Sequence, residues 1–296
     1  MVTLIEFVTD SLGDNIAFSP YADVYQKKHG GTVYVQTKWH NLFDTDNENV
    51  KFIPKTQVVQ SDVHHKLYML FKPGFNLQKV ACHQLGLDYI EIIPKLKVNN
   101  TIKFNKKKKY VCISVQSTAQ MKYWNNNSGW DKVVRYLKKL GYDVLVIDRD
   151  EVFGTKEKWN RIPSGAINET GNYPIEYRME QLKHCNFFIG LSSGLSWLAF
   201  AMKKKAIVIS GCTEETNEFN AGCYRVINNN VCHGCLNDDT IENIGQKLVN
   251  SGWMWCPRNK NFECTKEISF EMVKEKIDRC IKDIKSEITT TNIINV

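Results

Sequence analysis

Short apolar runs alternate with longer amphipathic stretches along this chain. In the first third, the pattern predicts a helix over residues 16–29 and strands at 2–8, 32–36 and 50–53. A second series begins at residue 110, with helices expected at 130–140 and 195–202 and strands at 110–115, 143–147, 187–190 and 206–210. Strands separated by helices of this length are typical of parallel sheets covered on both faces. We therefore expect an α/β protein.

A polar segment at residues 99–109, which ends in the lysine run Lys106–Lys109, separates the two series. We expect two Rossmann-like, doubly wound lobes, at residues 1–105 and 106–296, with a C-terminal helix in the second. Ligands of such sheets bind beyond the carboxyl ends of the strands. The cleft between the lobes is thus the expected binding site.

Composition excludes several classes of protein. The 296 residues are 43% hydrophobic and 24% charged, which is typical of a globular chain and not of a disordered or fibrous one. No stretch approaches the roughly 18 apolar residues of a membrane span. The first ten residues, MVTLIEFVTD, do not resemble a signal peptide. We expect a cytoplasmic protein without a membrane partner, in which thiols stay reduced.

The formal net charge of +7 is unevenly divided between the lobes. Residues 1–105 carry 11 Lys, no Arg and 10 Asp plus Glu, which leaves a charge of +1. Arginine reads base edges and phosphates better than lysine does. The first lobe therefore does not favour a nucleic-acid partner.

Cysteine spacing indicates a metal site. Ten cysteines are present, and four of them, Cys232, Cys235, Cys256 and Cys264, form a CxxC turn followed by a second pair. Such a set can chelate one tetrahedral ion, and four thiolates suit zinc or iron. A redox CxxC would open a helix after a strand, whereas this one lies in an Asn-rich loop. The other six cysteines have apolar neighbours and are expected to be buried thiols.

Three polar loops follow predicted strands. In the loop DSLGDN, residues 10–15, Asp14 is either a helix N-cap or a general base that faces the cleft. In the segment 117–124, Thr118 and Lys122 could converge on phosphate oxygens, or the segment could be an ordinary surface loop. At Ser192–Gly194, small residues open a helix, and backbone N–H groups with two hydroxyls there favour an anion. A plain N-cap would explain Ser192 or Ser193, but not easily the whole Ser-Ser-Gly at the end of a parallel strand.

These segments, in this order, resemble those of heptosyltransferases, a family of GT-B glycosyltransferases. The resemblance rests on DSLGDN, STAQMKYW and GLSSGLSWLAFAM. The later segments ISGCTEETNEFN, CHGC, WMWCPRNKNFECTKEI and FEMVKEKI are similar to one branch, the bacterial autotransporter heptosyltransferases. Members of that branch bind iron through four cysteines. Other heptosyltransferases have Asp-Thr-Gly where this chain has Ser192-Ser193-Gly194, and this difference agrees with the branch.

The resemblance implies a GT-B fold with an acceptor lobe followed by a nucleotide-sugar lobe that carries a four-Cys metal-binding insertion. It implies an inverting transfer of a sugar, of the heptose type, from a nucleotide-diphosphate donor to a hydroxyl group, with protein serine as the family acceptor. A hydroxylated base in DNA, modified by a phage-type glycosyltransferase, is an alternative acceptor. A non-catalytic sugar-nucleotide or metal-binding module is a third possibility.

The resemblance also suggests roles for single residues. Asp14 would be the general base, with Ser11, Gly13 and Asn15 on the acceptor side of the cleft. The donor would be bound by Thr118, Lys122, Ser192, Ser193 and Gly194, and Glu218 would contact donor or acceptor. The structural metal, iron with zinc as the alternative, would be held by Cys232, Cys235, Cys256 and Cys264. Family members carry an N-terminal domain before the DSLGDN loop, which begins here at residue 10; we therefore expect that domain to be missing and leave self-association open.

Overall fold

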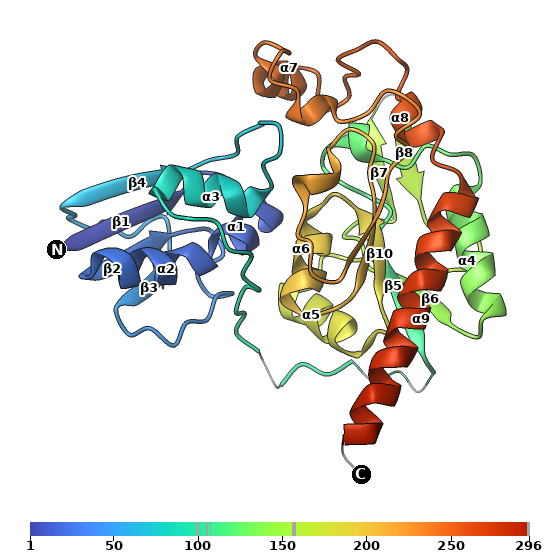
Figure 1. Cartoon of the computed structure of the whole chain (residues 1–296), viewed down its shortest axis with the longest axis horizontal. Coiled ribbons are helices and arrows are strands. Elements are labelled where there is room, and N and C mark those ends of the chain that lie inside the picture. The colour runs from blue at the N-terminus through green and yellow to red at the C-terminus, as the bar shows by residue number, and fades with distance from the viewer. Residues whose placement is uncertain (99–100, 105, 107, 156–157, 295–296) are drawn as a thin grey trace.

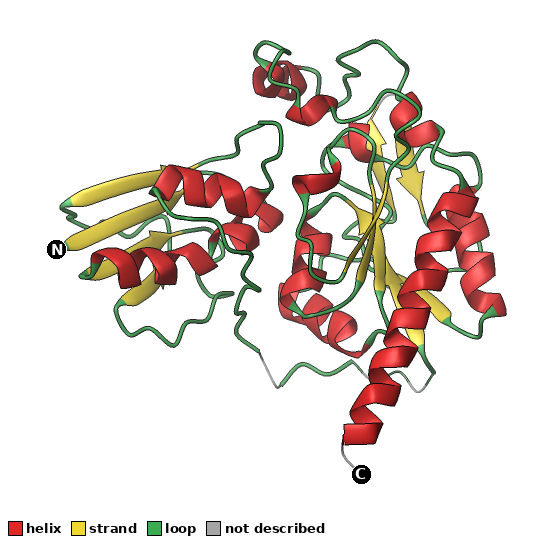
Figure 2. Ribbon diagram, in the orientation of Figure 1, coloured by secondary structure: helices red, strands yellow, loops and turns green. Residues whose placement is uncertain are grey.

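Two parallel sheets, joined by an extended segment, organise the chain (Figure 1). The computed structural model describes residues 1–98, 101–104, 106, 108–155 and 158–294. Parts of the linker predicted at 99–109 therefore lie outside the described residues. The first sheet has four strands and the second has six (Figure 2).

The first sheet has the order β3-β2-β1-β4, and all its pairs are parallel. Its strands are β1 (Val2–Phe7), β2 (Thr32–Gln36), β3 (Val50–Ile53) and β4 (Val63–Leu67). The helices of this lobe are α1 (Leu12–Phe18), α2 (Pro20–His29) and α3 (Leu77–Leu85). The strands predicted at 2–8, 32–36 and 50–53 are confirmed. Strand β4 was not predicted, because its sequence VHHKL is polar. It is an edge strand, and its first four residues alternate between partly buried and exposed.

The helix predicted over 16–29 is two helices. The first begins at Leu12, inside the segment that was expected to be a loop, and ends before Ser19. Pro20 is the first residue of the second helix. Proline lacks the N–H that would continue the first helix but suits the first turn of a new one, so the chain restarts there.

The second sheet has the order β12-β11-β10-β5-β6-β9, again with all pairs parallel. Its strands are β5 (Tyr110–Ile113), β6 (Asp143–Val146), β9 (Ile167–Asn168), β10 (Phe188–Leu191), β11 (Ala206–Ile209) and β12 (Cys223–Val226). An antiparallel hairpin of β7 (Val152–Thr155) and β8 (Lys158–Arg161) extends from this lobe. Its helices are α4 (Gly129–Lys139), α5 (Ile175–His184), α6 (Gly194–Ala201), α7 (Ile244–Asn250), α8 (Glu263–Lys266) and α9 (Phe270–Ile294).

Helices cover both faces of the second sheet (Figure 1). On one face, α4 and α9 pack over a cluster that includes Val133, Ile189 and Ile277. On the other face, α5 and α6 belong to an apolar cluster that continues into the first lobe and includes Phe18 and Trp197. The two lobes thus share one core region. Within the described residues, no helix is long and apolar enough to cross a membrane.

Candidate functional site

The two lobes meet where helices α1 and α6 begin (Figure 1). Each helix follows an interior strand of its own sheet, β1 and β10 respectively. A Cβ atom added to Gly13 would lie 3.2 Å from the Gly194 Cα, and one added to Gly194 would lie 3.2 Å from the Gly13 nitrogen. The two glycines therefore let the helix N-termini approach backbone to backbone. Both N-termini, with their partial positive charge, point into one junction.

Asp14 lies in this junction, in the first turn of α1. The residue is 3% exposed, and its Oδ2 atom has no hydrogen-bond partner among the described residues. Burial raises the pKa of the carboxyl group to about 6, against the lowering effects of Thr9, Lys122 and Ser11. Ser11 occupies the N-cap position, so the N-cap interpretation of Asp14 is wrong. A carboxylate of this kind can accept a proton at neutral pH.

A second carboxylate, Asp148, is also buried but has no free oxygen that could accept a proton from a substrate. Burial raises its pKa to about 7, but both of its oxygens are used within the protein. One accepts the Ser114 hydroxyl at 2.6 Å and the other accepts the Val115 N–H at 2.8 Å. Asp148 therefore ties the ends of β5 and β6 together, and Asp14 is the better candidate for a base.

The neighbours of Asp14 in the DSLGDN segment take structural positions. Asn15 is fully buried, and its side-chain amide donates to the carbonyls of Thr9 at 2.9 Å and Ser11 at 2.8 Å. Its side-chain oxygen accepts the hydroxyl of Thr37, which follows β2. Asn15 thus fixes the start of α1 against the neighbouring strand, while Ser11 is exposed at the mouth of the junction.

Lys122 reaches the same junction from the second lobe. It ends the short 3₁₀ helix η1 (Gln120–Lys122), which follows β5. Burial lowers the pKa of its ammonium group, and the charge of Arg225 adds to this effect, whereas Cys212 and Asp14 oppose it. Asp14 and Lys122 therefore act on each other electrostatically across the two lobes. Thr118 lies exposed on the same loop, four residues before Lys122.

The segment Ser192–Gly194 forms the start of α6, as expected. Ser193 is at the N-cap position, and its buried hydroxyl has no partner within the described part of the chain. Ser192 is buried and donates its hydroxyl to the carboxylate of Glu218. An unused hydroxyl at a helix N-terminus is a suitable arrangement for a phosphate.

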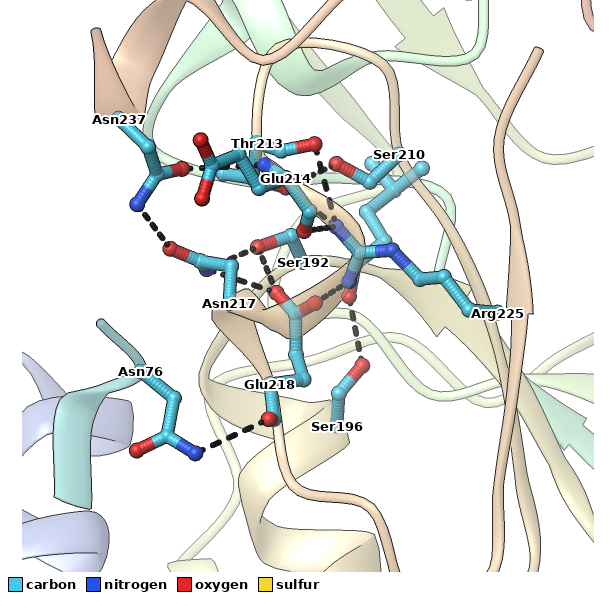
Figure 3. A network of polar contacts seen from close by, with 11 residues as sticks. Asn76, Ser192, Ser196, Ser210, Thr213, Glu214, Asn217, Glu218, Arg225 and Asn237 are labelled. Atoms are coloured by element: carbon cyan, nitrogen blue, oxygen red, sulfur yellow. Dashed lines mark hydrogen bonds and ion pairs between the residues drawn. The ribbon is translucent and has the colours of Figure 1, made fainter. Parts of the chain in front are cut away.

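Glu218 is part of a buried polar network (Figure 3). Its carboxylate forms an ion pair with Arg225 and accepts the side-chain amide of Asn217 at 3.1 Å. The side chain of Glu218 is 1% exposed and that of Arg225 is 5% exposed. Sequence analysis placed Glu218 at the site but missed Arg225, although one charged residue in the strand CYRV was a usable signal.

The four predicted metal ligands lie in the segment between β12 and α9, near enough for their thiols to affect one another's pKa values. Burial raises the pKa values of the Cys235 and Cys264 thiols, and the nearby thiols of Cys212, Cys232 and Cys256 raise them further. Among the described residues, however, no group of three His, Cys, Asp or Glu side chains is placed to hold a metal ion. The four-Cys site therefore remains a prediction.

Cys212 is a buried thiol, as expected, and it also lies beside this group. It packs in a small apolar cluster with Cys235, Leu236 and Leu248. The backbone explains this position, because the N–H of Leu236 donates to the Cys212 carbonyl at 2.7 Å. The CxxC turn is thus attached to the segment that follows β11.

Comparison with known proteins identifies the family. The profile of glycosyltransferase family 9 (heptosyltransferase) matches residues 49–243. The chain is 36% identical over 293 residues to the autotransporter heptosyltransferase BAHTCr of Citrobacter rodentium, across 93% of this chain and 70% of that protein. It is 37% identical over 292 residues to the autotransporter heptosyltransferase Aah of Escherichia coli, across 91% of this chain and 72% of that protein.

Solved structures agree with the sequence comparison. The iron-containing, dodecameric glycosyltransferase TibC from enterotoxigenic E. coli H10407 matches with a TM-score of 0.86 and 33% identity, over 95% of this chain and 76% of that one. A complex of TibC with ADP-D-β-D-heptose matches with a TM-score of 0.84 and 32% identity, over 95% and 76% of the two chains. The expected GT-B-like α/β fold is thereby confirmed. The chain is a glycosyltransferase of family 9 and belongs to the autotransporter heptosyltransferases.

Proposed function

We propose that this protein is an inverting heptosyltransferase that moves heptose from ADP-heptose to a serine hydroxyl of an acceptor protein. The observation that carries this proposal is the junction of α1 and α6, where Asp14 with its unpaired oxygen faces Lys122 from the other lobe. The TibC complex with ADP-D-β-D-heptose supports the choice of donor. The names of the relatives support an autotransporter as acceptor.

In this mechanism Asp14 is the general base. It removes the proton of the acceptor hydroxyl as the oxygen attacks the anomeric carbon of the donor. The new carbon–oxygen bond forms on the face opposite the diphosphate, and the bond to the phosphate oxygen breaks. ADP leaves with the bonding electron pair, and the proton remains on Asp14.

The leaving diphosphate requires positive charge and hydrogen-bond donors. Lys122 supplies the charge, and the N-terminus of α6 at Gly194 adds its dipole. The Ser193 hydroxyl, which has no partner within the described residues, and the exposed Thr118 hydroxyl supply donors. Ser192 immediately precedes Ser193, and its hydroxyl donates a hydrogen bond to the Glu218 carboxylate. We assign Ser11 and Gly13 to the acceptor side.

Two measurements test this proposal. The first is thermal unfolding with a panel of nucleotide sugars, in which ADP-heptose should give the largest stabilisation because only a ligand of the native state raises the unfolding midpoint. The second is mass spectrometry of an autotransporter passenger domain and of hydroxymethylated DNA after incubation with the enzyme and ADP-heptose. A mass increase of the protein at serine is expected. Sugar on the DNA would refute the protein acceptor, and undiminished transfer by Asp14→Ala would refute the base.

We further propose that Cys232, Cys235, Cys256 and Cys264 hold an iron ion that cross-links this segment, with zinc as the alternative. The donor chemistry fits, since four thiolates suit either metal. Two of the sulfur atoms accept hydrogen bonds. The backbone nitrogen of Lys260 donates to Cys256 Sγ at 3.3 Å, and Nη1 of Arg258 donates to Cys232 Sγ at 3.7 Å. Such bonds are typical of the groups around metal-bound thiolates.

Elemental analysis tests the metal assignment. Protein purified without added metal should contain one iron per chain, and the double variant Cys232→Ser/Cys256→Ser should contain none and unfold at a lower temperature. Cys82→Ser, which alters a buried thiol of the first lobe, is the control and should retain the metal. Equal metal content in all three proteins would exclude this site.

We also propose that the chain self-associates, because TibC is dodecameric. Light scattering on a size-exclusion column measures the mass directly. A mass that equals one chain of 34.2 kDa would contradict the proposal.

A further inference from the structure

The ion pair of Glu218 and Arg225 is buried beside the donor site but faces away from open solvent. Removing two charges from water is unfavourable, so such a pair persists only with further hydrogen bonds. Arg225 has these bonds at one nitrogen, Nη2, while its Nε atom has no partner among the described residues. Its Nη2 atom donates to the Thr213 hydroxyl at 2.5 Å and to the Glu214 carbonyl at 2.9 Å.

These contacts join the segment 213–218 to the following strand and to Ser192, which lies more than 20 residues earlier in the chain (Figure 3). Arg225 lies on β12, the edge strand of the second sheet. Thr213, Glu214 and Glu218 belong to the segment between β11 and β12. Ser192, which donates to Glu218, immediately precedes the N-cap of α6. One guanidinium group thus fixes the 213–218 segment and, through Glu218, the start of the phosphate-binding helix.

We propose that Arg225 and Glu218 are a positioning pair for the nucleoside diphosphate of the donor. Neither residue touches the donor; Ser192, Asn217 and Arg225 occupy the Glu218 carboxylate. Through Ser192, the pair fixes the start of α6, where the Ser193 hydroxyl is the N-cap and has no partner among the described residues. This inference rests on the proposed donor, and it replaces the expectation that Glu218 contacts donor or acceptor directly.

The geometry requires arginine and not only a positive charge. The planar guanidinium reaches a carboxylate with one nitrogen and a hydroxyl and a carbonyl with the other. An ammonium group on a flexible stem cannot hold these three acceptors in the same plane. Arg225→Lys therefore keeps the charge but loses the fixed arrangement.

The test measures ADP binding by titration calorimetry and separates kcat from KM for ADP-heptose. We expect Arg225→Lys and the double variant Arg225→Met/Glu218→Gln to weaken ADP binding and raise KM by about tenfold or more, the size of a lost hydrogen bond to a charged group. The double variant removes both charges, so it should unfold at a higher temperature than Arg225→Met alone. Val133→Ala, in the core beneath α4, is the control that lowers stability without changing ADP affinity.

The outcomes separate this inference from the proposed function. If the wild-type protein binds ADP and the folded variants bind it within twofold of the wild type, the positioning role is wrong while the donor stands. If Val133→Ala weakens ADP binding as much as Arg225→Lys does, the effect is one of stability and the inference is again wrong. If the wild-type protein does not bind ADP, the donor is wrong, and the positioning role for its diphosphate is wrong with it.

Discussion

At the level of single residues, the surroundings of Asp14 suit the proposed base and do not suit a residue that stabilises the fold. Its carboxylate is buried, one of its oxygens is unpaired within the described structure, and its pKa is raised to about 6. A buried ionised group without full pairing costs free energy of folding. Such a cost at one residue is typical of functional sites.

The first prediction concerns the pH dependence of activity. Asp14 must be ionised to accept a proton, so kcat/KM should fall as the pH drops below about 6. Asp14→Asn should abolish transfer while ADP still binds. A pH–rate profile of the wild-type enzyme and ADP titration of the variant measure these two effects. An acid limb near pH 4 would mean that the carboxyl group is not desolvated.

The second prediction concerns the stability of the same variant. The folded-state pKa of Asp14 lies above its ordinary value of 3.8, so the native state binds this proton more tightly than the unfolded state does. The contribution of Asp14 to stability is therefore complete below about pH 4 and is lost as the pH rises through 6. Asp14→Asn should raise the free energy of unfolding at pH 8 by on the order of 1–3 kcal/mol and leave it nearly unchanged at pH 4. Denaturant unfolding at both pH values checks this difference.

Sequence reasoning found the polar residues of the site better than it found their support. Asp14, Lys122 and Ser192–Gly194 each follow a predicted strand, where parallel sheets place their ligands, so the strand pattern marked them as candidates and the family resemblance supplied their proposed roles. Arg225 could not be found in that way, because its role depends on contacts with residues 213–218 that are set by the packing of β12 against β11. Cys212 is a similar case, since a backbone bond to Leu236 brings it to the other cysteines.

At the level of elements, the central strands were predictable and the edges were not. Strands such as β1 and β10 are apolar runs, since both faces of a parallel sheet are covered. The edge strand β4 and the hairpin of β7 and β8 carry polar residues and have no such run. The break between α1 and α2 depends on one proline that the helical period does not reveal.

The third prediction concerns the contact between the starts of α1 and α6. Gly194→Ala would place a methyl group 3.2 Å from the Gly13 nitrogen and 3.2 Å from the Leu12 Cβ, and backbone cannot yield as easily as a flexible side chain. We expect a loss of about 1–2 kcal/mol in stability, as for other overpacked sites, together with lower activity. The control is Gly245→Ala in α7, where the new methyl would meet Phe71 at an ordinary 3.5 Å. Thermal unfolding and initial rates of both variants are the measurements, and equal behaviour would refute the close contact.

At the level of the whole molecule, hydrogen bonds also join the two lobes. The Glu214 carboxylate of the second lobe accepts the Gly74 N–H of the first at 2.7 Å. In the other direction, the Glu91 carboxylate accepts the N–H groups of Asn220 at 2.6 Å and Ala221 at 2.8 Å. Asp14 is only 3% exposed, so if it is the proposed base, we expect the lobes to separate before an acceptor reaches it.

The fourth prediction follows from this need for opening. Glu91→Gln replaces a carboxylate that accepts two N–H groups with an amide that has one accepting oxygen, so it should weaken the closed arrangement. Weakening the hydrogen bonds to this charged acceptor should cost about 1–2 kcal/mol. The ratio of closed to open protein should therefore fall roughly tenfold. Amide hydrogen exchange in α1 and α6 should therefore become faster. ADP, which the proposed function places on the second lobe, should restore protection only in α6.

A matched control distinguishes lobe opening from general loosening. Asp62→Asn alters a carboxylate that also accepts a backbone N–H, that of Val2 at 2.7 Å, but both residues belong to the first lobe. If the Glu91 contacts hold the lobes together, exchange at the start of α6 should respond to Glu91→Gln and not to Asp62→Asn. Equal exchange in both variants would mean that the apolar cluster shared by the lobes keeps them closed without Glu91, and that access to Asp14 depends on movement within the first lobe alone.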